Sequence, residues 1–256
     1  MTKLATLTTN GPTATLALNR PDARNACSIE LLDAAHECVD ELGDAAGVRV
    51  LTITGTGRAF CAGMDLKQVI IDEAKGGCGD PELPRRLLGS LGRFTLRLRA
   101  LPCVTLAKVN GAAIGGGCGL ACCCDIAISH ADAKLGFPEV DLGLCPAVVA
   151  PWVVRKLGAG RARKVLLMGG VMSGTDALEV GIVDQLAPDR DGLDALADVV
   201  ADRLAKGGPH ALAATKNLLN ELDGSLDAAL IERGADLSAS VLARHEAQEI
   251  LAARVR

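Results

Sequence analysis

The chain has 256 residues, with 27 Lys and Arg against 31 Asp and Glu, which gives a formal net charge of −4 at pH 7. That balance provides no basic field for nucleic acid, because phosphate binding needs clustered cations. Hydrophobic residues make up 49% and charged residues 23%, which is typical of a globular chain rather than a disordered one. Only 2% are aromatic, which argues against binding single strands by base stacking.

Ten cysteines are the next unusual feature of the composition. Disulfide frameworks are typical of small secreted chains, whereas the segment after Met1 has neither the basic nor the apolar region of a signal peptide. No apolar run approaches the ~20 residues of a membrane span. We therefore expect a cytoplasmic protein with reduced thiols and no membrane partner.

A metal site is the sharper alternative, because four cysteines crowd one stretch: Cys118, Cys122, Cys123 and Cys124. Consecutive residues on a helix point about 100° apart, whereas thiolates that bind zinc must converge from paired turns. We therefore expect buried, small hydrophobic side chains here and no metal. The four histidines lie far apart in the sequence and are expected at the surface: His36, His130, His210 and His245.

The N-terminal half alternates predicted strands and helices. Segments 2–9 and 13–19 alternate in polarity and are joined by Asn10-Gly11-Pro12, which predicts a hairpin. Ser28 can cap the helix that follows. The further elements expected are a helix over 29–43, a strand over 48–54, a mobile loop over 72–84, a helix over 85–100, a strand over 103–109, a helix over 116–124 and a strand over 125–129. This alternation favours right-handed crossovers and largely parallel strands.

The pattern from about residue 146 onward is helical. Helices are expected over 147–157, 160–169, 175–180, 192–206, 209–222 and 225–254. No low-complexity linker separates this part from the first half. The helical part is therefore expected to pack on the core or on another subunit.

The stretch Asn110-Gly-Ala-Ala-Ile-Gly-Gly-Gly117 follows a predicted strand and opens a helix. It lacks the Lys-Ser/Thr of a phosphate-binding P-loop and the third glycine of a dinucleotide fingerprint. The first N–H groups of a helix are unpaired and carry the positive end of its dipole, and glycine lets a ligand approach them closely. The stretch can therefore bind an oxyanion, although a tight turn packed against the sheet is the alternative.

Four ordered motifs resemble the crotonase superfamily, also called the enoyl-CoA hydratase/isomerase family. They are LNRPDARNACSIELLDAAHECVDEL at 18–42, VRVLTITGTGRAFCAGMDLK at 48–67, VNGAAIGGGCGLACCCDIAI at 109–128 and FPEVDLGLCPA at 137–147. The resemblance covers nearly the whole chain. It implies an α/β fold, a spiral of ββα turns over 1–195 with the CoA and oxyanion site, and a C-terminal helical trimerisation region over 196–256.

The resemblance also implies a substrate and a way of binding it. The substrate is a coenzyme A thioester, no cofactor is permanently bound, and the assembly is a homotrimer or a dimer of trimers. Negative charge on the thioester oxygen is stabilised by the backbone N–H groups of Met64 and Gly116, and losing one such donor typically costs ~3 kcal/mol. The residues matched to the CoA contacts are Ala23, Arg24, Ala62, Gly63, Asp65, Leu66 and Gly115. Arg24 is either a phosphate partner or part of a surface salt bridge.

Acid–base chemistry falls to one matched carboxylate, Glu139, whose apolar neighbours are expected to desolvate it and raise its pKa. Hydratases of the family use two glutamates, and the second position is occupied here by Gly119. A third acidic position, used in dienoyl isomerases, falls near Ala147. Asp141 and Asp125 are close in sequence but are expected to point away from Glu139.

The reaction is left open between several alternatives. A single carboxylate can remove a proton and return it elsewhere, which is the chemistry of a Δ3,Δ2-enoyl-CoA isomerase. The tract Gly143–Pro151, however, resembles a branch described as hydratases of branched acyl-CoAs, and some members share a glycine at the position of Gly119. The further alternatives are a non-catalytic acyl-CoA-binding protein and another crotonase reaction, such as thioester hydrolysis, decarboxylation or dehalogenation.

Overall fold

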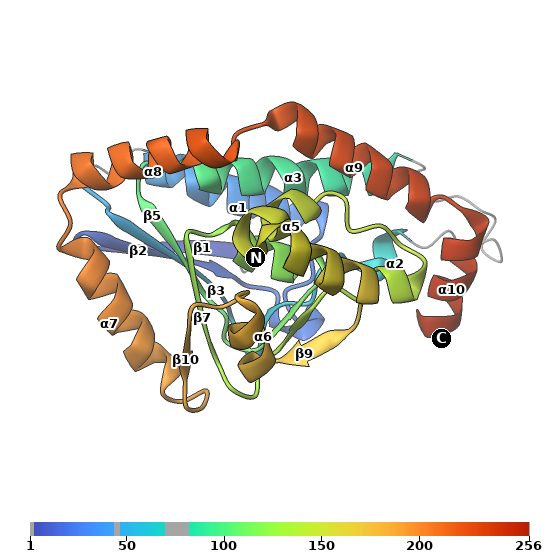
Figure 1. The fold of residues 1–256 in the computed structure, drawn as a ribbon, viewed down its shortest axis with the longest axis horizontal. Coiled ribbons are helices and arrows are strands. Elements are labelled where there is room, and N and C mark those ends of the chain that lie inside the picture. The colour runs from blue at the N-terminus through green and yellow to red at the C-terminus, as the bar shows by residue number, and fades with distance from the viewer. Residues whose placement is uncertain (1–2, 44–46, 70–81, 256) are drawn as a thin grey trace.

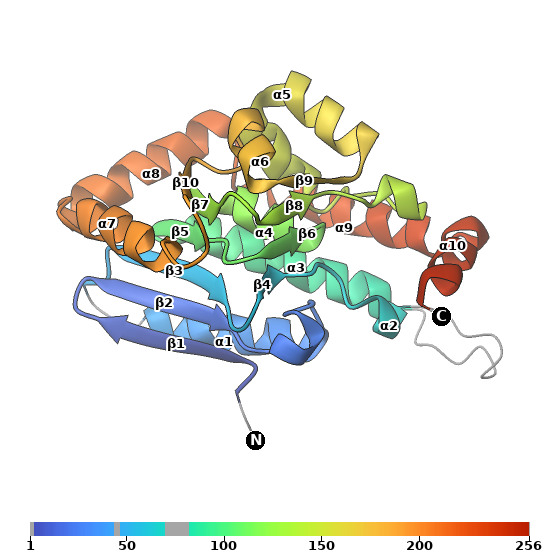
Figure 2. The same cartoon turned by 90° about the horizontal axis from the view of Figure 1, so that it is seen from below.

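A six-stranded sheet forms one wall of the fold in the computed structural model, which describes residues 3–43, 47–69 and 82–255. Its strand order is β1-β2-β3-β5-β7-β10, and Figures 1 and 2 show it from two sides. The strands are β1 (Ala5–Asn10), β2 (Thr13–Leu18), β3 (Val50–Gly55), β5 (Val104–Lys108), β7 (Ile126–His130) and β10 (Gln185–Ala187). Only the predicted hairpin β1–β2 is antiparallel; the other four pairings are parallel.

A second, smaller sheet was not predicted from the sequence. It has the order β4-β6-β8-β9 and consists of three-residue strands, which are too short to show an alternating pattern. These are β4 (Ala59–Cys61), β6 (Ala112–Ile114), β8 (Lys134–Gly136) and β9 (Val171–Ser173). Strands β4, β6 and β8 each follow a strand of the first sheet, so the chain repeats a long strand, a short strand and a helix. This repeat is the expected spiral of ββα turns.

The described residues of the spiral form six helices: α1 (Ile29–Gly43), α2 (Leu66–Val69), α3 (Leu83–Ala100), α4 (Gly116–Cys123), α5 (Ala150–Met168) and α6 (Gly174–Val180). Short 3-10 turns lie at Pro21–Ala23 and Val140–Leu142. The two helices predicted over 147–157 and 160–169 form one element, α5, with a break at Gly158, whose φ of 74° is not helical. The greater part of the mobile loop predicted over 72–84 lies outside the described residues.

Four C-terminal helices cover the spiral (Figure 1). They are α7 (Leu193–Ala205), α8 (Pro209–Asp223), α9 (Ala228–Leu242) and α10 (His245–Val255). The prediction of one helix over 225–254 was wrong, because the chain turns at Ala243 and Arg244 between α9 and α10. Helix α9 packs along α3, and α10 reaches α2 and the turn at Val140–Leu142. The predicted boundary between 195 and 196 falls inside α7, and the division into two regions stays a prediction.

The core is built mainly from aliphatic and small side chains, as the composition predicts, with Trp152 and the phenylalanines buried among them. The described cysteines are free thiols, and all but the half-buried Cys145 are buried. His130 was predicted at the surface, but it is only 6% exposed, because it lies on β7, an interior strand that pairs with β5 and β10. Within the described residues, no helix is long and apolar enough to cross a membrane, and no cluster of potential ligands could hold a metal ion.

Candidate active site

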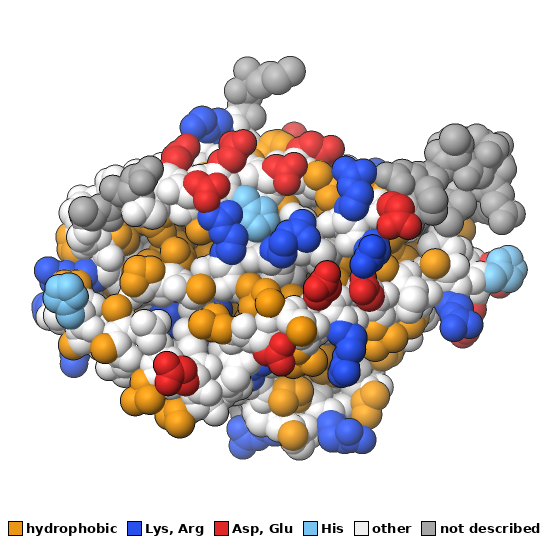
Figure 3. Space-filling view, turned by 90° about the horizontal axis from the view of Figure 1, so that it is seen from above, with side chains coloured by type: hydrophobic (Ala, Val, Ile, Leu, Met, Phe, Trp, Pro, Cys, Tyr) orange, Lys and Arg blue, Asp and Glu red, His pale blue; other side chains and the backbone are white. Residues whose placement is uncertain are grey.

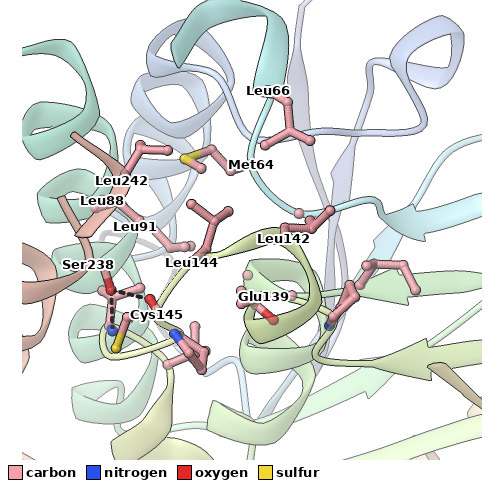
Figure 4. A pocket seen from close by; sticks show the side chains of 18 of the residues that line it. Met64, Leu66, Leu88, Leu91, Glu139, Leu142, Leu144, Cys145, Ser238 and Leu242 are labelled. Carbon is pink, nitrogen blue, oxygen red and sulfur yellow. Dashed lines mark hydrogen bonds between the residues drawn. The ribbon is translucent and has the colours of Figure 1, made fainter. Parts of the chain in front are cut away.

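An apolar cavity of about 140 Å³ lies between the spiral, including its helix α3, and the C-terminal helix α9. Its walls come from the loop after β4, the start of α4, the segment 138–149 and the two helices. Figure 4 shows Leu88, Leu91, Leu144 and Leu242 gathered on one side of Glu139. A cavity of roughly 150 Å³ accommodates a benzene-sized apolar molecule. The site can therefore enclose a short acyl group or part of a longer one.

The predicted oxyanion donors come from two segments that touch. Met64 lies in the loop after β4 and forms a parallel β-bridge with Cys27. In this bridge the Cys27 N–H donates to the Gly63 carbonyl at 2.7 Å, and the Asp65 N–H donates to the Cys27 carbonyl at 3.0 Å. This pairing leaves the Met64 N–H without a backbone partner in the described part of the chain. Gly116 begins α4, so its N–H has no acceptor within the helix and carries the positive end of the helix dipole.

Two glycines make the close approach of these segments possible. Gly63 has a φ of +86°, and a Cβ there would lie 2.6 Å from the Ile114 carbonyl oxygen and 3.5 Å from the Gly116 nitrogen. Gly115 has a φ of +53°, and a Cβ there would lie 2.7 Å from Glu139 Oε1. Both values are in the left-handed region that favours glycine. The Glu139 carboxylate therefore lies directly over the backbone that leads into α4.

Glu139 is the acidic group of the cavity, and its environment is poor in hydrogen bonds. Its Oε2 atom is buried and has no hydrogen-bond partner among the described residues. Burial raises the pKa of Glu139 to about 7, and a hydrogen bond from its own backbone N–H offsets part of that rise. The predicted desolvation of this glutamate is thus present, and near neutral pH the carboxyl group is poised to take up or release a proton.

Gly119, the position that the resemblance matches to a second glutamate, has no room for a side chain. A Cβ atom at Gly119 would lie 2.3 Å from Val149 Cγ1 and 2.4 Å from Val149 Cβ. Val149 is 1% exposed and lines the cavity beside Glu139. An apolar side chain therefore fills the space in which a side chain at 119 would begin. The resemblance predicts that a glutamate is missing here, but the sequence does not show that Val149 occupies the space.

The two other nearby acids lie away from the cavity, as expected. Asp141 accepts a hydrogen bond from the Gly170 N–H at 2.8 Å. Asp125 accepts from the Thr105 N–H at 2.7 Å and pairs with Arg99 at 3.1 Å. Neither residue borders the cavity, so Glu139 is its only carboxylate among the described lining residues.

Four of the residues matched to the CoA contacts lie at the cavity, and the others lie in or beside the loop that borders it. Ala62, Gly63, Leu66 and Gly115 border the cavity itself. The Ala62 N–H donates to the carbonyl of Arg24 at 3.0 Å, which places Ala23 and Arg24 beside that loop. Arg24 is exposed with a φ of 52°, and no ion pair of its side chain occurs within the described residues.

Asp65 has a structural partner that the sequence analysis missed. Arg20 donates to the Asp65 carboxylate at 2.7 Å and to the Ala26 carbonyl at 3.2 Å, which ties the loop after β4 to the segment before α1. Both partners lie inside the matched motifs, but only the folded chain brings them together. The apolar wall was missed for the same reason: Leu88 and Leu242 come from helices whose sequence pattern shows a buried face and no more.

Comparison with known proteins gives the class of this fold and site. Residues 8–253 match the family described as enoyl-CoA hydratase/isomerase. A Thermus thermophilus protein named "Putative enoyl-CoA hydratase" is 37% identical over 214 residues, 84% of this chain and 83% of that protein. The "Crotonyl-CoA hydratase" of Syntrophomonas wolfei is 34% identical over 197 residues, 76% of this chain and 73% of that protein.

A solved structure extends the match to three dimensions. The crystal structure of an enoyl-CoA hydratase from Mycobacterium avium has a TM-score of 0.86 and 27% identity, and the match covers 100% of this chain and 97% of that one. The chain therefore belongs to the enoyl-CoA hydratase/isomerase family of the crotonase superfamily. The family and fold expected from the four motifs are confirmed.

Proposed function

We propose that the protein moves a double bond within an acyl-CoA, converting a 3-enoyl-CoA to a 2-enoyl-CoA. The observation that carries this proposal is that Glu139 is the only carboxylate among the described residues that line the cavity. Moving a proton between two carbons needs one group that first accepts and then donates. A carboxyl group with a pKa of about 7 suits both steps near neutral pH.

In the proposed reaction the thioester oxygen binds between the N–H groups of Met64 and Gly116. Glu139 takes the proton from the carbon next to the thioester carbonyl, and the electron pair moves onto the thioester oxygen as a dienolate. The two N–H donors stabilise that charge, each by ~3 kcal/mol. The proton on Glu139 then returns to the γ carbon, so the double bond shifts and the enzyme regains its starting state.

Hydration of a 2-enoyl-CoA is the second candidate, favoured by the names of the two relatives above. With one carboxylate, Glu139 would remove a proton from water as the oxygen attacks the β carbon and would then deliver that proton to the α carbon. No second acid would hold the water, because Val149 fills that space. We therefore rank hydration below isomerisation for this chain.

The binding and assembly of the protein form part of the same proposal. Ala23, Arg24, Ala62, Gly63, Asp65, Leu66 and Gly115 are proposed to hold the CoA portion, with Arg24 beside a phosphate. The substrate is a free CoA thioester and no permanently bound cofactor is invoked. The protein is proposed to act in the cytoplasm as a homotrimer or a dimer of trimers.

The test is a pair of assays on one preparation, with a 3-enoyl-CoA alone and with a 2-enoyl-CoA in water. Wild type is expected to isomerise the first substrate faster than it hydrates the second. The substitution Glu139→Gln, which keeps the shape and removes the proton carrier, is expected to lower the isomerisation rate 10²-fold or more, on the order of the usual contribution of general acid–base catalysis.

The matched control is Asp141→Asn, which removes a carboxylate two residues away that lies outside the cavity. It is expected to retain at least about half of the wild-type activity. Full activity of Glu139→Gln in both assays would contradict the mechanism. Binding of acyl-CoA without turnover of either substrate would instead favour the non-catalytic alternative.

A further inference from the structure

A second cavity, of about 270 Å³, lies at the C-terminal end of α4, away from Glu139. It is lined by Arg99, Cys122, Cys124, Asp125, Trp152, Arg155, Lys156 and Asp184. None of these residues borders the cavity proposed for the acyl group. We call it the Arg155 cavity. Unlike the acyl cavity, it is bordered mostly by charged side chains. Each of these charges is expected to have a partner of opposite charge.

The two carboxylates of the Arg155 cavity are already paired. Asp125 binds Arg99 at 3.1 Å and also binds Lys216, which approaches from α8, at 2.8 Å. Asp184 accepts from the Ala127 N–H at 2.8 Å and from the Lys156 ammonium at 2.6 Å. Neither carboxylate is therefore left to neutralise a further cation.

Arg155 forms no ion pair with a carboxylate among the described residues. Its Nε donates to the Asp223 carbonyl at 3.2 Å and its Nη2 donates to the Gly224 carbonyl. Its Nη1 is buried and has no hydrogen-bond partner among the described residues. The Arg155 guanidinium carbon lies over the Trp152 ring, 5.2 Å from its centroid, and the ring supplies no oxygen acceptor for the guanidinium donors.

The nearest remaining acids do not fill this gap. The Asp223 carboxylate binds Arg99 at 3.0 Å, and the Asp227 carboxylate caps α9 by accepting from the Leu230 N–H at 2.9 Å. Burial lowers the pKa of Arg155, which reflects the cost of holding its charge away from water. A buried donor on a charged group without an acceptor is rare in folded proteins and points to a bound water or ion.

We propose that the Arg155 cavity binds a small anion with oxygen acceptors, of the phosphate or carboxylate class, through the Arg155 guanidinium and the Lys156 ammonium. The lining carries three cations (Arg99, Arg155 and Lys156) and two carboxylates (Asp125 and Asp184). The net charge of these five side chains is +1, so a singly charged anion brings the lining to neutrality and supplies an oxygen acceptor for the guanidinium. The source is either a free anion or a carboxylate of a second copy of the chain.

The test compares thermal unfolding in inorganic phosphate and in chloride at equal ionic strength. Phosphate also stabilises folded proteins without a specific site, by exclusion from their surface. The matched control is therefore Arg163→Gln, an exposed arginine on the same helix α5. Wild type and the control are expected to show the same phosphate-dependent rise in Tm, and Arg155→Gln is expected to lose most of it.

Two further measurements keep the proposal open to refutation. Titration calorimetry of wild type with inorganic phosphate tests binding directly, even where Arg155→Gln does not fold. Light scattering at several protein concentrations tests the second source, because a carboxylate from another copy would make the assembly weaker in Arg155→Gln.

Each combination of results has one meaning. Phosphate binding that is lost in Arg155→Gln supports a free anion as the ligand. No phosphate response, together with a smaller assembly in Arg155→Gln, supports a carboxylate of a second copy. An equal phosphate shift in wild type and Arg155→Gln, or no phosphate response and an unchanged assembly, overturns the proposal and leaves water as the partner of Nη1.

Discussion

At the scale of single residues, Glu139 shows how packing prepares a group for chemistry. Its Oε1 lies over Gly115, and its Oε2 is buried without a hydrogen-bond partner among the described residues. Burial destabilises the anion more than the neutral acid, so the pKa rises to about 7. In the proposed isomerisation only the anion can take the first proton, and below that pKa most of the enzyme holds the unreactive form.

The pH profile of the reaction follows from the raised pKa of Glu139. We expect kcat/KM for a 3-enoyl-CoA to rise with pH and to level off above the pKa of about 7. Initial rates measured from about pH 5 to about pH 9 would check it, with Asp141→Asn as the variant whose midpoint stays unchanged. A flat profile across that range would show that another group carries the proton.

The sequence predicts Glu139, Met64 and Gly116 as site residues, because they lie inside continuous motifs whose order and spacing match a family, and all three border the same cavity. It could not locate Val149, although Val149 decides whether position 119 can hold a side chain. The two residues are thirty positions apart, and their contact exists only once α4 packs against the segment before α5. Local pattern therefore finds the candidate site residues and misses the packing around them.

A double-mutant cycle can test this contact. We expect Gly119→Ala to destabilise the protein by about 1–3 kcal/mol, because its Cβ would overlap Val149. In a Val149→Gly background the same change fills the space that was vacated, so the two effects should couple favourably by about 1 kcal/mol or more. Urea unfolding of the four proteins gives the coupling.

The control for this cycle is Gly160→Ala, a helical glycine on α5 whose added Cβ meets no atom within 4 Å. It should be neutral or slightly stabilising, because alanine favours a helix. Additive effects of Gly119→Ala and Val149→Gly would mean that the site relaxes around a side chain at 119, and would reopen the case for a second carboxylate there.

At the scale of elements, the sequence predicts the longer helices and strands but not the shortest strands. Helices such as α1 and α8 and the hairpin β1–β2 show a clear period or turn signal, and they lie within a few residues of their predicted bounds. The strands of the second sheet have three residues each, and no period can be read from three positions. The break between α9 and α10 was also missed, because neither glycine nor proline marks it.

Helix α9 also fixes the loop that carries part of the cavity wall. The Ser238 hydroxyl, 4% exposed, donates to the Cys145 carbonyl at 2.8 Å and accepts from the Val148 N–H at 3.2 Å. Figure 4 shows these contacts beside the acyl cavity. One hydroxyl thus satisfies two backbone groups and holds the segment before α5 against α9.

Ser238→Ala is therefore expected to lower the free energy of unfolding by about 1–3 kcal/mol, because two buried backbone groups lose their partner. It should also raise KM for acyl-CoA, since the wall of the cavity loosens. Ser240→Ala, two residues on and exposed, is the control and should change stability by about 0.5 kcal/mol or less. Equal effects of the two substitutions would show that the Ser238 contacts do not hold the wall.

At the scale of the whole molecule, α8 has polar side chains on its buried face and leucines on its exposed face, the reverse of an ordinary surface helix. Its inner face buries Lys216 and Asn220, and Lys216 binds Asp125 and the Cys103 carbonyl. Its outer face exposes Leu218, Leu219 and Leu222 at 54%, 54% and 75%. Figure 3 looks onto the side of the molecule that carries α8 and α9, where hydrophobic side chains lie among charged ones. A surface helix normally turns its apolar stripe inward, so another chain is expected to cover this one.

The family resemblance predicts that the partner is a second copy in a trimer, and the assembly of α8 variants tests it. We expect wild type to have three or six times the mass of one chain by light scattering. Replacing Leu219 and Leu222 together by Arg should shift the protein toward single chains, because two charges would have to be desolvated in the interface. The matched control is Val199→Arg, a 67% exposed residue on α7, which should leave the mass unchanged. A monomeric wild type, or an unchanged mass in the double variant, would show that α8 is not the contact between copies.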